Sequence, residues 1–145
     1  MKEKILISAC LLGEKVRYDG KGTPVSEMEQ LQEKFDLIPL CPEVQGGLPV
    51  PRDPAEIRNG LVLTREGKDV TDSFRKGAQI ALACCQENGI TKALLKARSP
   101  SCGKDLIYDG SHSGRLTEGH GLTCALLLEN NIHVYTETDI GGLLK

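Results

Sequence analysis

Short apolar runs alternate with helix-forming segments along this chain, and that alternation limits its possible folds more than any other feature. The runs are too short for buried helices and suit strands that are covered on both faces. We expect four such strands, at residues 5–9, 35–40, 92–97 and 132–135. We expect helices between and after them, at residues 25–34, 71–88, 119–130 and 140–144.

Strands that alternate with helices indicate an α/β fold built on a parallel sheet. Right-handed crossovers place helices on both faces, so we predict a three-layer, Rossmann-like or flavodoxin-like arrangement with strand order 2-1-3-4. Residues 61–64 and 69–70, joined by a turn, predict a small hairpin insertion. Thr71 or Asp72 is the expected N-cap of the long helix. With 145 residues and no repeat or linker, we expect one domain over residues 1–145.

Composition argues against several classes of function. The formal net charge is −2 and aromatic residues make up 3% of the chain, so we expect no binding to nucleic acid or to an anionic membrane. The apolar run near the N-terminus is followed at once by Glu14, Lys15 and Arg17, which favours a first strand over a signal peptide. We therefore expect a cytoplasmic protein, and the sequence leaves its oligomeric state open.

The six cysteines need an explanation, because in a reduced cytoplasm cysteines are metal ligands, catalytic groups or core residues. Cys10 and Cys41 follow the first two predicted strands, and Cys102 lies in the loop after the third. The carboxyl ends of parallel strands meet at one edge, where open α/β sheets bind ligands. The sequence therefore predicts one site that contains these three thiols. The other three lie on apolar helix faces and are expected in the core: Cys84, Cys85 and Cys124.

Three thiolates suit either an iron–sulfur cluster or a zinc ion. No C-x₂-C pair occurs, so zinc-ribbon and ferredoxin-type spacings do not apply, and spacing alone leaves coincidence open. Pro42 and Gly103 directly follow two of these cysteines, where they fix the exit of the chain and allow close approach to a bulky group. The three histidines show no metal-ligand spacing and are expected to be structural or exposed: His112, His120 and His133.

The contexts of these cysteines resemble the thiouracil desulfidase (TudS-like) family over essentially the whole chain. The matching motifs are SACLLG at 8–13, VRYDG at 16–20, CPEV at 41–44, GGLPVPR at 46–52, SPSCG at 99–103, IYDG at 107–110 and GHGLT at 119–123. The resemblance implies a [4Fe-4S] cluster held by three cysteines, which match Cys10, Cys41 and Cys102. It also implies hydrolysis of 2-thiouracil to uracil and hydrogen sulfide without net redox change, with Glu43 and Ser101 in the catalytic set.

The residue types are consistent with that chemistry. An iron that lacks a cysteine ligand is a Lewis acid, and it matches a soft thiocarbonyl sulfur. Glu43 suits a general base or proton shuttle, and Ser101 suits substrate orientation or proton relay, although they could also be a cap and a turn former. A substrate oxygen or the cluster charge could be met by Arg17, Arg52 or Arg98. The expected partner is a small thiolated base. A non-catalytic iron–sulfur or sulfur-carrier module and a metal-free thiol redox protein remain open alternatives.

Overall fold

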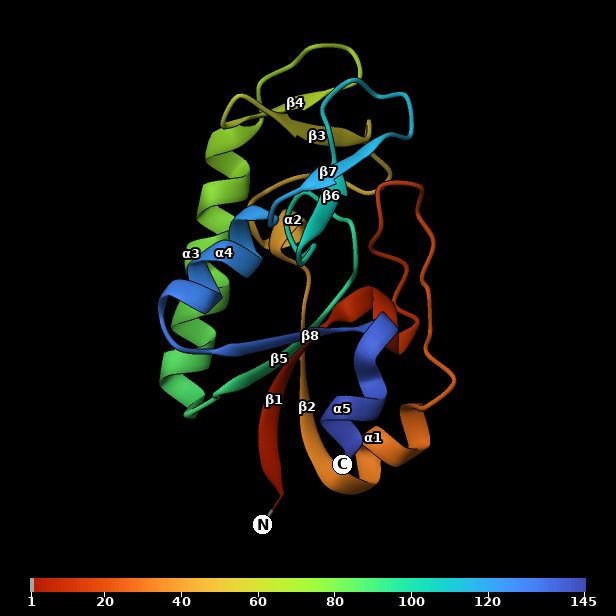
Figure 1. The fold of residues 1–145 in the computed structure, drawn as a ribbon, viewed down its shortest axis with the longest axis vertical. Helices are drawn as coiled ribbons and strands as arrows, with labels where there is room; N and C mark the ends of the chain where they lie inside the picture. Colours follow the sequence, from red (N-terminus) through yellow and green to blue (C-terminus); the bar gives the residue numbers. More distant parts are fainter. Residues whose placement is uncertain (1) are drawn as a thin grey trace.

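The computed structural model describes residues 2–145 and has a four-stranded parallel sheet at its centre (Figure 1). Its strands are β1 (Glu3–Ser8), β2 (Phe35–Leu40), β5 (Lys92–Leu95) and β8 (His133–Thr136). Their order is β2-β1-β5-β8, and every neighbouring pair is parallel. The four predicted strands and the predicted order 2-1-3-4 are confirmed.

Helices cover both faces of the sheet, which confirms the three-layer arrangement (Figure 1). One layer contains α1 (Met28–Lys34) and α5 (Ile140–Leu144), and the other contains α3 (Thr71–Asn88) and α4 (Leu122–Glu129). Successive side chains of β1 pack against the two helix layers in turn, because side chains of a strand alternate between the faces of the sheet. Leu6 packs in the core cluster of α3 and α4, whereas Ile5 and Ile7 pack in the cluster of α1 and α5.

The long helix α3 has the predicted bounds but not the predicted cap. Val70 occupies the N-cap position and makes no side-chain hydrogen bond there, so neither Thr71 nor Asp72 caps the helix. The Asp69 carboxylate instead accepts a hydrogen bond from the Thr71 backbone N–H at 2.9 Å. The Thr71 hydroxyl accepts from the backbone N–H of Val62 at 2.8 Å, which ties the helix to a neighbouring strand.

Two antiparallel hairpins lie beyond the carboxyl edge of the sheet (Figure 1). The first pairs β3 (Ala55–Arg58) with β4 (Leu61–Thr64), and the second pairs β6 (Leu106–Tyr108) with β7 (Leu116–Glu118). The predicted hairpin of residues 61–64 with 69–70 is present in short form: an antiparallel Leu63–Asp69 bridge joins the two segments, and the Val70 N–H donates to the Val62 carbonyl at 2.9 Å. The additional pairing of β4 with β3 is not predicted. It depends on Asn59 and Gly60, which have positive φ of 53° and 79° and form a two-residue turn.

Short helical segments follow three of the central strands. These are the 3₁₀ turn η1 (Ala9–Leu12) after β1, the helix α2 (Pro42–Gln45) after β2 and the 3₁₀ turn η2 (Glu137–Asp139) after β8. Helix α4 begins three residues later than predicted because Gly121, its extended N-cap, packs directly on a loop. A Cβ atom at Gly121 would lie 2.5 Å from the carbonyl carbon of Ser101. Within residues 2–145, no helix has the length and apolar character needed to cross a membrane.

Candidate active site

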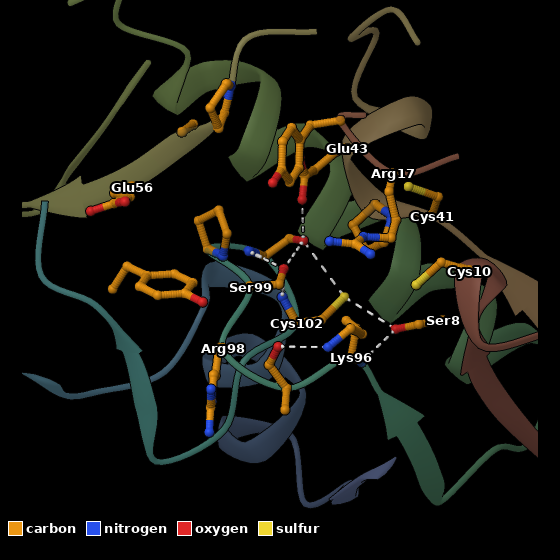
Figure 2. A pocket seen from close by; sticks show the side chains of 18 of the residues that line it. Ser8, Cys10, Arg17, Cys41, Glu43, Glu56, Lys96, Arg98, Ser99 and Cys102 are labelled. Atoms are coloured by element: carbon orange, nitrogen blue, oxygen red, sulfur yellow. Dashed lines mark hydrogen bonds between the residues drawn. The ribbon is translucent and has the colours of Figure 1, made fainter. Parts of the chain in front are cut away.

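A cavity of about 500 Å³ opens at the carboxyl edge of the sheet, where strands β1, β2 and β5 end. Cys10 lies in η1 after β1, Cys41 follows β2, and Cys102 lies in the loop after β5. All three thiols line this cavity together with Glu43 and Ser101, so the five predicted site residues occur in one place (Figure 2). The hairpins β3–β4 and β6–β7 contribute residues to the opposite wall.

The backbone of each of the three cysteines is fixed by its local structure. The carbonyl of Cys10 accepts hydrogen bonds from the N–H groups of Gly13, at 3.0 Å, and Thr23, at 2.8 Å. Cys41 is the N-cap of α2, and the next residue is a proline in the first turn, which fixes the chain direction. Cys102 is held by the Ser99 side chain, whose hydroxyl oxygen accepts from the Cys102 N–H at 3.0 Å.

Close backbone packing fixes these segments relative to the helices. A Cβ atom at Gly77 of α3 would overlap the carbonyl oxygen of Pro42, so α3 and α2 approach one another as only a glycine allows. At the other side of the site, the N-terminus of α4 packs on the loop that carries Ser101, and its Thr123 N–H donates to the Ser101 carbonyl at 2.9 Å. The cavity wall is therefore built on rigid contacts rather than on free loops.

Burial sets the protonation of the three thiols in the metal-free protein. It raises the pKa of Cys10 and of Cys41, and it raises the pKa of Cys102 to about 12, although the hydrogen bond from the Ser8 hydroxyl partly opposes the rise. Cys41 adds to the rise at Cys10, and Cys10 adds to the rise at Cys102, because neighbouring thiolates repel one another. The thiols are thus neutral at pH 7 until a positive group binds between them.

The donor set fits a bound iron–sulfur cluster better than a single ion. A zinc ion needs sulfur ligands about 2.3 Å from it, and within residues 2–145 no three His, Cys, Asp or Glu side chains are placed to hold one ion. The three free thiols instead surround a cavity. The Thr23 hydroxyl oxygen beside Cys10 is buried without a hydrogen-bond partner, and a thiolate ligand at Cys10 would give it one.

Glu43 is the centre of a buried polar network (Figure 2). Its Oε1 accepts from Nε and Nη2 of Arg52, both at 3.1 Å, and its Oε2 accepts from the Ser101 hydroxyl at 2.9 Å. Arg52 also donates from Nη1 to the carbonyl oxygens of Val16 and Pro49, each at 3.1 Å. The Arg52 side chain is only 7% exposed. Arg52 is therefore committed to positioning Glu43, and it is not a free substrate-binding cation.

Ser99 extends this network with a defined direction. Its hydroxyl oxygen lies 2.9 Å from that of Ser101, and the single Ser101 proton is already donated to Glu43. Ser99 must therefore donate to Ser101 while it accepts from the backbone N–H groups of Ser101 and Cys102, at 3.1 and 3.0 Å. The hydroxyls form a chain that runs from Ser99 through Ser101 to the Glu43 carboxylate.

A model of the 2-thiouracil desulfurase family matches residues 5–139, which is most of the described chain. The chain belongs to this family. It is also similar to a structure of the [4Fe-4S]-dependent thiouracil desulfidase TudS, with a TM-score of 0.92 and 45% identity over 98% of this chain and 95% of the other. An uncharacterized protein of Bacillus subtilis (strain 168), YbbK, is 35% identical over 150 residues, covering 97% of this chain and 99% of its own. The family resemblance found in the motifs is confirmed.

Three further cationic side chains of this desulfurase-family site differ in the contacts that they make. Arg17 lies over the Tyr18 ring and 3.8 Å from Asp19, and Arg98 lines the cavity from a left-handed backbone position with φ of 68°. Lys96, which sequence reasoning did not single out, also lines the cavity and pairs with Glu137 at 2.6 Å.

The three histidines have no role as ligands of a single ion among the described residues. His112 lines the far wall, where its Nδ1 lies 3.6 Å from Glu56. His120 accepts the Asp105 N–H at 3.0 Å, and His133 is exposed. The exposed position of His133 agrees with the sequence prediction, whereas His112 belongs to the cavity lining.

Sequence reasoning missed Ser8, Ser99 and the role of Arg52 in this desulfurase-family site. A signal for Ser8 exists, because the period of two along β1 places it on the same face as Leu6, where Cys102 also packs. Ser99 stands in the SPSCG motif, but its hydrogen bonds depend on the loop conformation. No pattern in the sequence distinguishes Arg52 from the other two predicted arginines, because its contacts come from the path of residues 46–54.

Proposed function

We propose that this chain removes sulfur from 2-thiouracil, or from a closely related thiolated base, with a [4Fe-4S] cluster bound by Cys10, Cys41 and Cys102. Membership of the 2-thiouracil desulfurase family and 45% identity to TudS support the proposal. The observation that carries it is the cavity itself, since three free thiols and a carboxylate–hydroxyl pair face the same space. The proposal assigns the activity to residues 1–145 as one domain.

Three cysteines leave one iron of such a cluster without a protein ligand. When bound, the cluster supplies a Lewis-acid iron with affinity for sulfur, which withdraws electrons from the thiocarbonyl carbon. The surrounding side chains have the task of placing the substrate ring and water next to that position. The reaction balances as hydrolysis: the carbon–sulfur double bond is replaced by a carbon–oxygen double bond, and both protons of water leave with sulfur as hydrogen sulfide.

Glu43 is the proposed general base for the attacking water. The two Arg52 donors occupy both lone pairs of Oε1, and Ser101 occupies one of Oε2, so Oε2 keeps one lone pair for a water proton. The Arg52 fork holds the carboxylate in one orientation, so the base is placed before substrate binds. Glu43 is 15% exposed at its side chain, so a water molecule that reaches it does so through the cavity.

Ser101 is the proposed proton relay between Glu43 and the reacting group. Its hydroxyl donates to Glu43 and accepts from Ser99, so the proton it holds can shift to the carboxylate only if Ser99 replaces it. In the opposite direction, a proton taken up by Glu43 can be returned through Ser101 toward departing sulfur. Its hydroxyl lies 3.6 Å from the sulfur of Cys102, a proposed cluster ligand, and this short distance supports the role of Ser101 as a relay.

Three features of the chain support further parts of the proposal. All six cysteines are free thiols, which is typical of a reducing cytoplasm. The burial that raises the pKa values of Cys10, Cys41 and Cys102 makes them poor nucleophiles without metal, which argues against a metal-free thiol redox protein. The proposed partner is a free thiolated base, since nothing in the net charge of −2 favours nucleic acid.

The test is turnover under anaerobic conditions. Protein reconstituted with iron and sulfide is incubated with 2-thiouracil, and uracil and hydrogen sulfide are measured together. We expect equal amounts of both products with no added reductant or oxidant. A fully loaded protein that binds the cluster but forms neither product would contradict the catalytic proposal and favour a sulfur-carrier module. A panel of bases with sulfur at other ring positions then identifies the preferred substrate.

A further inference from the structure

Ser8 occupies a contact that the proposed reaction does not use. It is the last residue of β1 and only 3% exposed. Its hydroxyl oxygen accepts a hydrogen bond from the backbone N–H of Lys96 at 2.9 Å and donates one to the Cys102 Sγ at 3.3 Å (Figure 2). The backbone N–H can only donate, so the Ser8 proton is directed at the sulfur.

The other hydroxyl near this sulfur is already engaged. Ser101 Oγ lies 3.6 Å from the Cys102 Sγ but donates its proton to Glu43 Oε2 at the shorter distance of 2.9 Å. A hydroxyl has one proton to donate. Ser8 is therefore the side chain whose donor is available to Cys102.

Thr23 is a second hydroxyl residue in contact with a proposed ligand, Cys10. Its backbone N–H donates to the Cys10 carbonyl at 2.8 Å, so the two residues are locked together. Its Oγ1 is buried and lacks a hydrogen-bond partner within residues 2–145. A buried hydroxyl without a partner costs free energy, and a negatively charged sulfur at Cys10 would satisfy it.

We propose that Ser8 and Thr23 donate hydrogen bonds to the sulfur atoms of Cys102 and Cys10 in the cluster-bound protein and so raise the reduction potential of the cluster. This inference rests on the cofactor of the proposed function. One-electron reduction adds negative charge that spreads onto the ligand sulfurs, and an O–H donor stabilises the more negative form. A sulfur that accepts a hydrogen bond also donates less electron density to iron, which keeps the open iron receptive to a thiocarbonyl sulfur.

The test compares cluster potentials across matched variants reconstituted without air. Ser8→Ala and Thr23→Val remove one donor each, and Ser8→Thr and Thr23→Ser keep a hydroxyl. Thr123→Val is the matched control, because the Thr123 hydroxyl is also buried and without a partner, but its backbone N–H binds Ser101 and not a proposed cluster ligand. Iron and sulfide content is measured first, and the midpoint potential is then followed by electron paramagnetic resonance.

We expect equal cluster content in all variants and a more negative potential in Ser8→Ala and Thr23→Val, with a larger shift in the double variant. Ser8→Thr, Thr23→Ser and Thr123→Val should keep the wild-type potential. Unchanged potentials in loaded Ser8→Ala and Thr23→Val, or an equal shift in Thr123→Val, would overturn the inference and leave the proposed function intact. Failure of the wild type to bind a cluster would overturn both. If Ser8→Ala does not fold, the nearly isosteric Thr23→Val decides the outcome.

Discussion

The six cysteines form two sets of three. The cavity set is Cys10, Cys41 and Cys102, and the helix set is Cys84, Cys85 and Cys124 on α3 and α4. The two sets differ in their surroundings rather than in their burial. Cys85 and Cys124 of the helix layer are 1% and 0% exposed, and Cys10 and Cys102 of the cavity are 7% and 4% exposed. Burial raises the pKa of Cys124 and of Cys102 alike to about 12. By these measures alone, the helix set and the cavity set would be judged equivalent.

Polar neighbours separate the two sets. Cys102 receives the Ser8 hydroxyl at 3.3 Å and faces the cavity. The Cys124 sulfur lies 3.9 Å from His120 Nδ1, but that nitrogen already accepts the Asp105 N–H at 3.0 Å. Cys124 therefore has neither a base nor space for a ligand. A cysteine at a strand's carboxyl end, with donors aimed at its sulfur, is placed for binding, whereas one on a helix face fills the core.

Replacement of a cavity cysteine should have the largest effect on activity. Cys102→Ser removes a proposed cluster ligand, so the cluster and its Lewis acid are lost and turnover of 2-thiouracil falls to the assay background. Cys85→Ala removes a sulfur of the helix layer and should keep the wild-type rate. The rates of both variants are measured anaerobically. A folded but inactive Cys85→Ala, or an active Cys102→Ser, would contradict the assignment of cluster binding to the cavity cysteines.

Replacement of the carboxylate should affect chemistry without affecting the cluster. Glu43→Gln keeps the shape of the side chain but removes the base, so kcat should fall by about 10²–10⁴-fold. Iron content and visible spectrum should match those of the wild type. Glu87→Gln is the control, because it makes the same substitution on helix α3, outside the cavity. A wild-type rate in Glu43→Gln would remove Glu43 from the mechanism.

Replacement of Arg52 should have a smaller effect, because Arg52 acts through Glu43. Arg52→Gln loses the fork on Glu43 Oε1, and a misplaced base costs up to about 10²-fold in kcat. Arg52→Lys should recover part of the rate, since one donor can still reach the carboxylate. Cluster content serves as the internal control. A raised KM with unchanged kcat would instead indicate that Arg52 binds substrate.

The helix set should make the stability of the protein depend on pH at high pH. Burial raises the pKa of Cys85 to about 11 and that of Cys124 to about 12, above the ordinary value of 9.0. The folded protein therefore keeps thiol protons that the unfolded chain loses, and this contribution to stability is complete below pH 9 and is lost as the pH rises toward 12. Each retained proton changes the free energy of unfolding by about 1.4 kcal/mol per pH unit. Urea unfolding of metal-free protein between pH 9 and 11 should show a shallower decline for Cys124→Ala, and equal slopes would contradict the account.

The sequence predicts the sheet and the position of the site for the same reason. Buried parallel strands leave continuous apolar runs, so the strands and the order 2-1-3-4 can be read, and the ends of those runs locate Cys10, Cys41 and Cys102. The hairpins are different. Strand β7 is exposed throughout and β6 has one buried residue, so no apolar alternation reveals them.

Sequence patterns do not predict the second hairpin turn or the side-chain contacts within the site. The predicted turn at residues 65–68 is present, but Asn59-Gly60 is a second recognisable turn, and it identifies the β3–β4 hairpin that the prediction lacks. The Arg52–Glu43 pair depends on the course of the intervening loop, which periodicity does not describe. The residue types of the site can thus be predicted, but which of them hold one another cannot.

The most direct measurement is the iron and sulfide content of a variant that keeps only the cavity cysteines, with Cys84, Cys85 and Cys124 all replaced by alanine. After anaerobic reconstitution, and with folding confirmed by circular dichroism, we expect the wild-type spectrum and the four iron and four sulfide atoms per chain of a [4Fe-4S] cluster. The account is contradicted if this folded variant binds no cluster, because a helix-layer cysteine would then be a ligand.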